Sequence, residues 1–249
     1  MKKYLNLMLI IFILVTHASI LMAEETALSI IKKMEEMNQT DSSKTEMSML
    51  IYPDVYDKDD YRLMKVLSYS RGEDNSYMVF LSPKTIKGLS ILSKGGEQWV
   101  YFPSTGRVRK IAGQSKKKSV KGVGGDFTYE DMGGGSFEED YTFTLNKTGD
   151  TQWVIEGLPK DEDSSYTKII VYVNKKDYLM DKVEYYTEDE GHYKDLIMKD
   201  YKKMNGKLMP SKIIMANLSK ESMTVIITHT AEYDVDIDDK YFNPTRFYK

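Results

Sequence analysis

The sequence of 249 residues contains no cysteine, only three histidines and only six prolines. The lack of cysteine excludes a disulfide framework, a thiolate metal site and a lipid attached through a cysteine. A formal net charge of −3 argues against nucleic-acid binding, because a surface that follows phosphates is normally basic. The chain has no G-x-S-x-G elbow, P-loop or H-E-x-x-H motif. We therefore predict no catalytic residue, no cofactor and no metal site.

The first 23 residues have the pattern of a secretory signal peptide. Lys2 and Lys3 precede an apolar run at residues 5–15, and neutral residues follow as far as Ala23. The run is too short to cross a bilayer, so an uncleaved anchor is the weaker alternative. We predict cleavage near Ala23 and export to the periplasm. The segment holds two lysines and no acidic residue, so residues 24–249 keep a net charge of −5. Their length is typical of one β domain, and we predict a single domain.

The hydrophobic pattern predicts one helix followed mainly by strands. Residues 25–39 place apolar side chains at helical spacing, with charged side chains between them. Alternation then predicts about eleven to thirteen strands, among them residues 85–92 and 223–233. In the last of these, His229 falls on the apolar side, where a core histidine is expected. Short turns and no helical crossovers indicate an antiparallel, meandering sheet.

Residues 112–136 do not fit this pattern, because they combine seven glycines and four lysines in one long stretch. The segment is too rich in glycine for a strand and too long for an ordinary hairpin loop. Loops of this length are usually functional or disordered. The basic run from Arg107 to Lys121 is conspicuous in an acidic protein, and either a solvated face or attraction to anionic groups explains it.

Four segments near this loop carry a family resemblance. They read W-V-Y-F-P at residues 99–103, R-V-R-K-I at 107–111, K-K-K-S at 116–119 and G-G-D-F-T-Y-E-D-M at 124–132. Together they resemble the LolA-like branch of the LolA/LolB superfamily of outer-membrane lipoprotein-sorting proteins. Its motif resembles G-S-D-F-S-Y-E-D-L, from which Gly125 and Met132 depart mildly. Residues 207–211 and 239–242 also resemble that family, so the likeness covers most of the chain.

The resemblance implies a mainly β fold in which a half-open, curved antiparallel sheet, an incomplete barrel, is covered by helices. It also implies that the concave apolar face receives acyl chains of lipoproteins or lipids. The partners would then be those acyl chains, an inner-membrane transporter and an outer-membrane acceptor. The missing cysteine matches the soluble carrier of this superfamily rather than an anchored acceptor.

Two sets of residues are candidates for such a site, and core packing or simple solvation remains the alternative for each. The candidates for an apolar cavity wall, chosen by alternation, are Met47, Met49, Ile51, Tyr77, Val79, Leu81, Trp99 and Tyr101. The candidates for contact with a headgroup or partner are Arg107, Arg109, Lys110, Lys116, Lys117, Lys118 and Lys121.

The sequence thus favours a periplasmic carrier that buries acyl chains, since burial gains about 0.8 kcal/mol per methylene. An interaction or sensor module of the same fold, which binds an exporter or a signalling partner, is the alternative. An enzyme is the weakest hypothesis.

Overall fold

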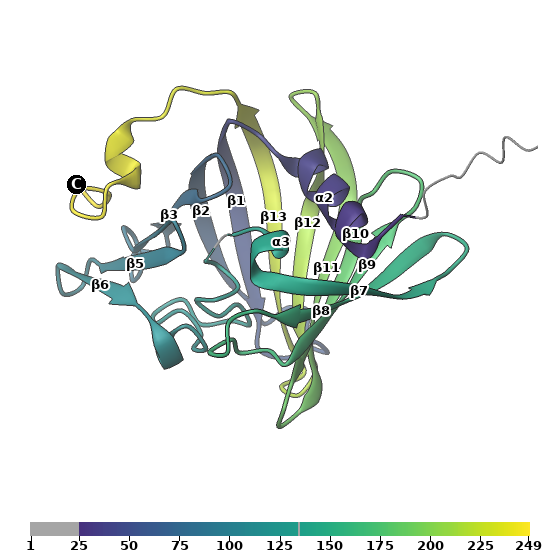
Figure 1. Ribbon diagram of the computed structural model, residues 1–249. Helices are drawn as coiled ribbons and strands as arrows, with labels where there is room; N and C mark the ends of the chain where they lie inside the picture. Colours follow the sequence, from purple (N-terminus) through teal and green to yellow (C-terminus); the bar gives the residue numbers. More distant parts are fainter. Residues whose placement is uncertain (1–24, 134) are drawn as a thin grey trace, which may run out of the picture.

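Thirteen strands form one antiparallel sheet in the computed structural model, which describes residues 25–133 and 135–249 (Figure 1). The predicted signal peptide lies outside the described residues. The strands are β1 (Ser42–Tyr52), β2 (Arg62–Arg71), β3 (Asn75–Ser82), β4 (Ser90–Lys94), β5 (Glu97–Phe102), β6 (Arg107–Ile111), β7 (Tyr141–Thr148), β8 (Gln152–Pro159), β9 (Lys168–Asn174), β10 (Met180–Thr187), β11 (Gly191–Met204), β12 (Lys207–Asn217) and β13 (Ser222–Tyr233).

The strand order is β6-β5-β4-β3-β2-β1-β13-β12-β11-β10-β9-β8-β7. Each strand therefore pairs with its sequence neighbour, and only β1 with β13 is a long-range pair. The two edge strands, β6 and β7, do not pair with each other, so the described sheet is not closed into a barrel. Residues 112–136 connect these two edges, which explains why the segment is long. The mainly β, half-open antiparallel fold expected from the sequence is confirmed.

The helix α2 (Ala27–Asn38) covers one face of the sheet, together with the short helix α3 (Phe137–Asp140) (Figure 1). The hydroxyl of Thr26 caps α2 by accepting a hydrogen bond from the Ser29 amide at 3.1 Å. Ile30 and Ile31 are fully buried against the sheet. Full burial of such a side chain stabilises the fold by about 1.5–3 kcal/mol. We call the face under α2, α3 and residues 112–133 the inner face, and the opposite one the outer face. Residues 112–133 are called the crossing segment.

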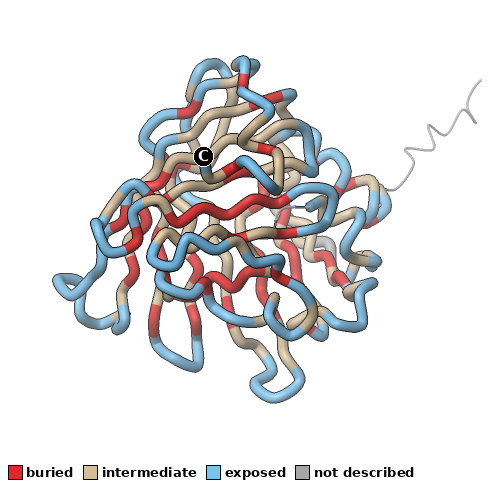
Figure 2. The backbone as a smooth tube through the Cα atoms, turned by 90° about the vertical axis from the view of Figure 1, so that its left-hand side faces the viewer, coloured by how far each residue is buried: buried red, intermediate tan, exposed pale blue. Residues whose placement is uncertain are grey.

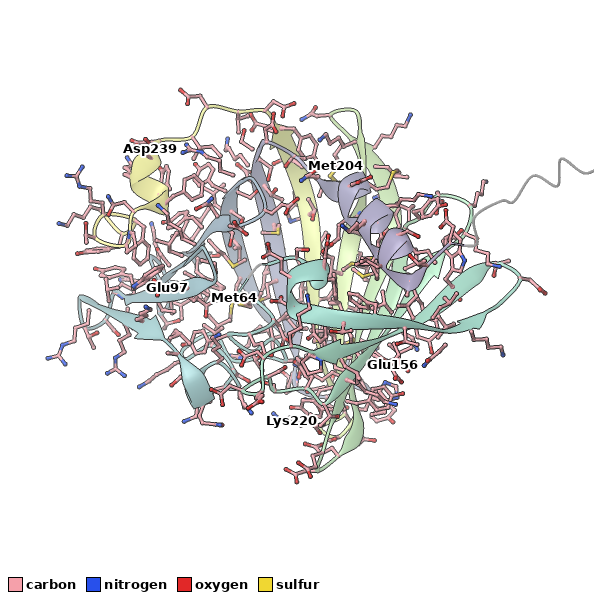
Figure 3. All side chains as sticks on the ribbon, viewed as in Figure 1. Met64, Glu97, Glu156, Met204, Lys220 and Asp239 are labelled. Carbon is pink, nitrogen blue, oxygen red and sulfur yellow. The ribbon has the colours of Figure 1, made fainter. Side chains whose placement is uncertain are left out.

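Hydrophobic clusters cover both faces of the sheet. On the inner face, two clusters meet at Met132 and Ile226: one packs α2 against β8 to β12, and the other packs residues 120–129 against β1 to β6. Met64 of β2 belongs to the second cluster (Figure 3). On the outer face, residues 235–248 cover β2 to β6 and bury Phe242 and Phe247. Buried residues follow the strands and exposed ones gather in the turns (Figure 2).

Two local predictions were wrong. Residues 83–89 form turns, so the strand expected at 85–92 begins only at Ser90. A register shift opposite Glu46 and Met47 makes His229 an extra residue in β13. His229 lies exposed on the outer face, where no core cluster of the described residues covers this end of β13, and its Nε2 lies 2.7 Å from the hydroxyl of Ser48. No helix among the described residues is long and apolar enough to cross a membrane.

Candidate functional site

A cavity of about 600 Å³ opens on the inner face, between the end of the sheet that carries β5 and the end that carries β7 and β8. Helix α3, the end of the crossing segment and the β8–β9 loop complete its wall. Such a volume lies within the range of pockets that hold small organic ligands, about 300–1,000 Å³.

The floor of the cavity is apolar and adaptable. Met180 of β10 and Leu196 and Met198 of β11 line it, with Tyr166 and Tyr185 beside them. Met180, Tyr166 and Tyr185 are buried, whereas Leu196 and Met198 are only half-buried. Flexible thioether side chains adjust to ligands of irregular shape. The floor therefore offers apolar surface that the protein's own packing does not fully cover.

The mouth of the cavity is acidic. Its carboxylates belong to the exposed residues Asp74, Glu139, Asp140, Asp161 and Asp163, of which the Asp140 carboxyl is itself partly buried. Desolvation raises the pKa of Asp140, and the neighbouring charges of Glu139 and Glu130 raise it further. Burial raises the pKa of the Tyr141 phenol, and the charges of Glu130, Asp140 and Asp131 raise it further.

The segment that crosses the inner face is fixed to the sheet by its acidic residues. The carboxylate of Asp126 accepts hydrogen bonds from the hydroxyls of Ser222 at 2.6 Å and Thr224 at 2.8 Å, both on β13. The carboxylate of Glu130 accepts a hydrogen bond from the Ser164 hydroxyl at 2.8 Å and one from the Ser165 amide at 3.0 Å. These bonds hold the segment against both halves of the sheet.

A buried ion pair completes this attachment. The ammonium of Lys194 on β11 lies 2.7 Å from Oδ2 of Asp131, and the two side chains are 0% and 2% exposed. The phenol of Tyr166 donates to Oδ1 of the same aspartate at 2.5 Å. Burial raises the pKa of Tyr166, and the Asp131 charge raises it further, so the phenol remains a donor. The rings of Tyr166, Tyr193 and Tyr185 lie 5.2, 5.4 and 5.9 Å from the ammonium.

Gly125 explains why the crossing segment needs glycine. Its φ of +80° lies in the left-handed region, and a Cβ atom there would come within 2.7 Å of the Thr224 hydroxyl and 3.1 Å of Ile51. A side chain at this position would be strained by the positive φ and would have to displace the side chains of Thr224 and Ile51.

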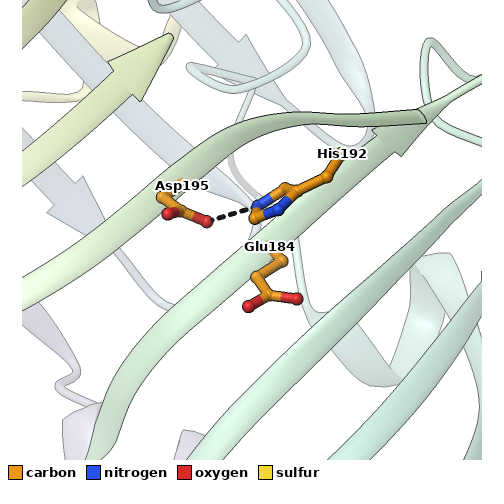
Figure 4. A group of neighbouring side chains, drawn as sticks. All are labelled: Glu184, His192 and Asp195. Carbon is orange, nitrogen blue, oxygen red and sulfur yellow. Dashed lines mark hydrogen bonds and ion pairs between the residues drawn. The ribbon is translucent and has the colours of Figure 1, made fainter. Parts of the chain in front are cut away.

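Three side chains on the outer face resemble a metal site (Figure 4). One ligand atom each of Glu184, His192 and Asp195 lies within 4.8 Å of the others. However, the Lys182 ammonium lies 2.5 Å from the Glu184 carboxylate, and the Tyr172 and Tyr186 phenols donate to it at 3.0 and 2.9 Å. A lysine at this carboxylate opposes a bound cation, so we interpret the group as a hydrogen-bonded network.

Comparisons with known proteins identify the family. A family model described as "Uncharacterized protein" matches residues 72–249, which is more than half of the chain. The chain belongs to this family. No curated protein matches the sequence.

Solved structures show that this chain has the LolA-like fold. A putative outer membrane lipoprotein-sorting protein domain from Vibrio parahaemolyticus is 25% identical, with a TM-score of 0.77 over 90% of this chain and 98% of that one. A DUF1329 family protein from Desulfovibrio piger is 23% identical, with a TM-score of 0.76 over 88% and 98%. A LolA superfamily protein from Nitrosomonas europaea is 24% identical, with a TM-score of 0.72 over the same shares. The predicted resemblance is confirmed.

The LolA-like inner face holds only the first group of predicted wall residues. Met47, Met49 and Ile51 of β1 belong to the inner cluster. Met49 is 1% and Ile51 is 4% exposed, because the crossing segment covers them. They form packed core beside the cavity and do not line it.

The other predicted wall residues lie on the outer face, which corrects the sequence-based expectation. Tyr77, Val79, Trp99 and Tyr101 pack under the C-terminal segment. Rings of Tyr101 and Tyr248 stack at 4.6 Å. Leu81 is the extra residue of a register shift in β3 and is 43% exposed. The inner positions of β3 and β5 belong instead to Met78, Phe80, Val100 and Phe102. The apolar C-terminal segment covers the outer face of β3 and β5. These strands therefore carry hydrophobic residues on both faces.

The predicted basic residues are divided between an edge strand and the crossing segment. Arg107, Arg109 and Lys110 lie exposed on β6, where Lys110 pairs with Glu97. Charged side chains on an edge strand also prevent edge-to-edge pairing. Lys118 and Lys121 are exposed, Lys117 is half-buried, and Lys116 lines the cavity mouth. Their contact with a headgroup or partner stays a prediction.

Sequence reasoning missed the residues that make the cavity. Leu196 and Met198 lie in a strand that was predicted, but nothing in its alternation marks a wall that is left uncovered. Lys194 offered one signal, since alternation places it on the same side of β11 as Leu196 and Met198, where a charge needs a buried partner.

Proposed function

We propose that the protein is a periplasmic carrier that binds acyl chains of lipids or lipoproteins in the inner-face cavity and moves them toward the outer membrane. The observation that carries this proposal is the cavity itself, with the half-buried side chains of Leu196 and Met198 in its floor. Each methylene that leaves water for such a floor gains about 0.8 kcal/mol. A carrier needs no reacting group, so we propose that the protein is not an enzyme.

The similarity to a putative outer membrane lipoprotein-sorting domain supports transport toward the outer membrane. An inner-membrane transporter would load the carrier, and an outer-membrane acceptor would receive the cargo. The basic residues of β6 would bring the cavity close to anionic headgroups, since each basic residue near such a surface contributes about 1 kcal/mol.

Organic extraction of the protein purified from its native host, followed by mass spectrometry, tests the proposal. We expect a lipid or an acylated peptide in stoichiometric amount. An empty protein that co-purifies with a membrane protein would instead favour the interaction module.

The proposed location rests on the first 23 residues of the sequence. Intact-mass measurement of material released from the periplasm should give a chain that begins near Glu24. Recovery of the full-length chain in the inner membrane would contradict periplasmic release.

A further inference from the structure

The charge around the cavity is strongly unbalanced. Seven of its lining residues carry a carboxyl group and two carry an ammonium group. The acidic ones are Asp74, Glu130, Asp131, Glu139, Asp140, Asp161 and Asp163, and the basic ones are Lys116 and Lys160.

Little of this negative charge is neutralised within the protein. Lys194 pairs with Asp131 at 2.7 Å. Among the described residues, no ion pair involves Glu139, Asp140 or Asp161. Lys160 directs its ammonium to the backbone oxygen of Glu138 at 2.8 Å. Lys116 lowers the pKa of Asp140 less than desolvation and the neighbouring carboxylates raise it. The mouth of the cavity, which we also call its rim, thus keeps a surplus of negative charge.

The depth of each group decides which part of a ligand meets this charge. The unpaired carboxylates belong to exposed residues at the mouth, whereas Met180 and Tyr185 are buried in the floor. An acyl tail that fills the floor therefore leaves its head group among the carboxylates. Two charges near a protein surface interact more strongly than the same charges in bulk water, so the sign of the head group affects the affinity.

We propose that the cavity selects acyl ligands with a cationic head group and discriminates against acyl ligands with an anionic head group. This inference rests on the proposed carrier function and adds a class of cargo to it. The basic strand β6 and the acidic rim then have different tasks. The strand attracts the protein to an anionic membrane surface, and the rim rejects the anionic lipids of that surface as cargo.

Three probes with the same twelve-carbon chain test the inference: dodecylamine, dodecanoate and the uncharged monododecanoyl glycerol. Each is used below its micellar concentration at pH 7, and displacement of a fluorescent acyl probe from the full mature protein gives the dissociation constant. We expect the amine to bind at least tenfold more tightly than the carboxylate at low salt. At 1 M salt, where the screening length falls to about 3 Å, this ratio should shrink severalfold.

A rim variant connects the selectivity to named residues. Combining Glu139→Gln, Asp140→Asn and Asp161→Asn should lower the amine-to-carboxylate ratio at least threefold. The matched control combines Glu188→Gln, Asp189→Asn and Glu190→Gln in the β10–β11 turn, which does not line the cavity. This control removes the same charge from the chain and should keep the wild-type ratio.

The outcomes separate the inference from the function on which it rests. Equal affinities for the amine and the carboxylate, or an unchanged ratio in the rim variant, would overturn the selectivity while leaving an acyl carrier. Failure of all three probes to bind would overturn the carrier function, and the selectivity with it.

Discussion

The ammonium of Lys194 and the carboxylate of Asp131 join β11 to the segment that crosses the inner face, 2.7 Å apart and almost without exposure. Removal of one partner leaves the other charge buried, which costs about 3–5 kcal/mol. We therefore expect Asp131→Asn or Lys194→Met to lower the free energy of unfolding by about that amount. Urea unfolding followed by tryptophan fluorescence measures the change.

An exposed ion pair provides the control for this prediction. Lys44 and Glu232 lie 3.0 Å apart across β1 and β13, with side chains 33% and 50% exposed. Glu232→Gln should cost less than about 1 kcal/mol. The double variant of Lys194 and Asp131 should lose less than the sum of the single variants, because neither charge then remains unpaired. Additive losses would mean that the two groups do not interact.

The order and type of the elements could be predicted from the sequence because each strand pairs with its neighbour in the chain. Local alternation and turn residues suffice for such a meander. The faces of β3 and β5 could not be predicted. Tyr77 and Trp99 alternate with Met78 and Val100, and both sets are apolar. Only the position of the C-terminal segment, a tertiary contact, distinguishes the outer set from the inner one.

The position of the cavity was even harder to predict from the sequence than the faces of β3 and β5. It exists because the edge strands β6 and β7 do not pair and because the crossing segment fills only part of the inner face. The motif at residues 124–132 signals the family, but its Asp126 and Asp131 attach that segment to the sheet. Their partners Thr224 and Lys194 lie far along the chain, so no local pattern connects them.

A tryptophan in the cavity should block acyl binding without unfolding the protein. Met198 lines the cavity and is half-buried, so Met198→Trp should fill space that the packed core does not use. We expect at least a tenfold loss of affinity for a fluorescent acyl probe and a nearly unchanged thermal midpoint. Met49 supplies the contrast, because it is 1% exposed within the inner core. Met49→Trp should overpack that core and cost about 1–3 kcal/mol of stability.

The network around Glu184 predicts a dependence of stability on pH. Burial alone would raise the pKa of Glu184, but hydrogen bonds from Lys182, Tyr186 and Tyr172 lower it below its usual value of 4.5. Between the two values the unfolded chain binds more protons than the folded one. The stability that this carboxylate contributes is therefore present above pH 4.5 and is lost as the pH falls through the lowered pKa.

Glu184→Gln isolates this contribution. The difference in unfolding free energy between the wild type and the variant should be largest near neutral pH and should shrink below pH 4.5. Urea titrations at several pH values give this difference. A difference that stays constant down to pH 3 would show that the carboxylate has the same pKa in both states.

Added zinc or manganese should leave the melting temperature unchanged, because Lys182 already neutralises the Glu184 carboxylate. A rise in that temperature would favour a metal site instead.

Reversal of the basic charges at the β6 end of the molecule should weaken attachment to anionic membranes. The test variant carries Arg107→Glu, Arg109→Glu, Lys118→Glu and Lys121→Glu, all at exposed positions. Each basic residue near an anionic surface contributes about 1 kcal/mol, so vesicles that contain anionic lipid should bind this variant at least tenfold more weakly. Salt should weaken binding of the wild type in the same way. The control reverses four exposed lysines elsewhere, Lys58, Lys176, Lys202 and Lys203, which gives the same net charge. Equal losses in both variants would mean that net charge alone governs attachment. No loss in either variant would mean that the β6 charges do not bind membranes and serve only to prevent pairing at the open edge of the sheet.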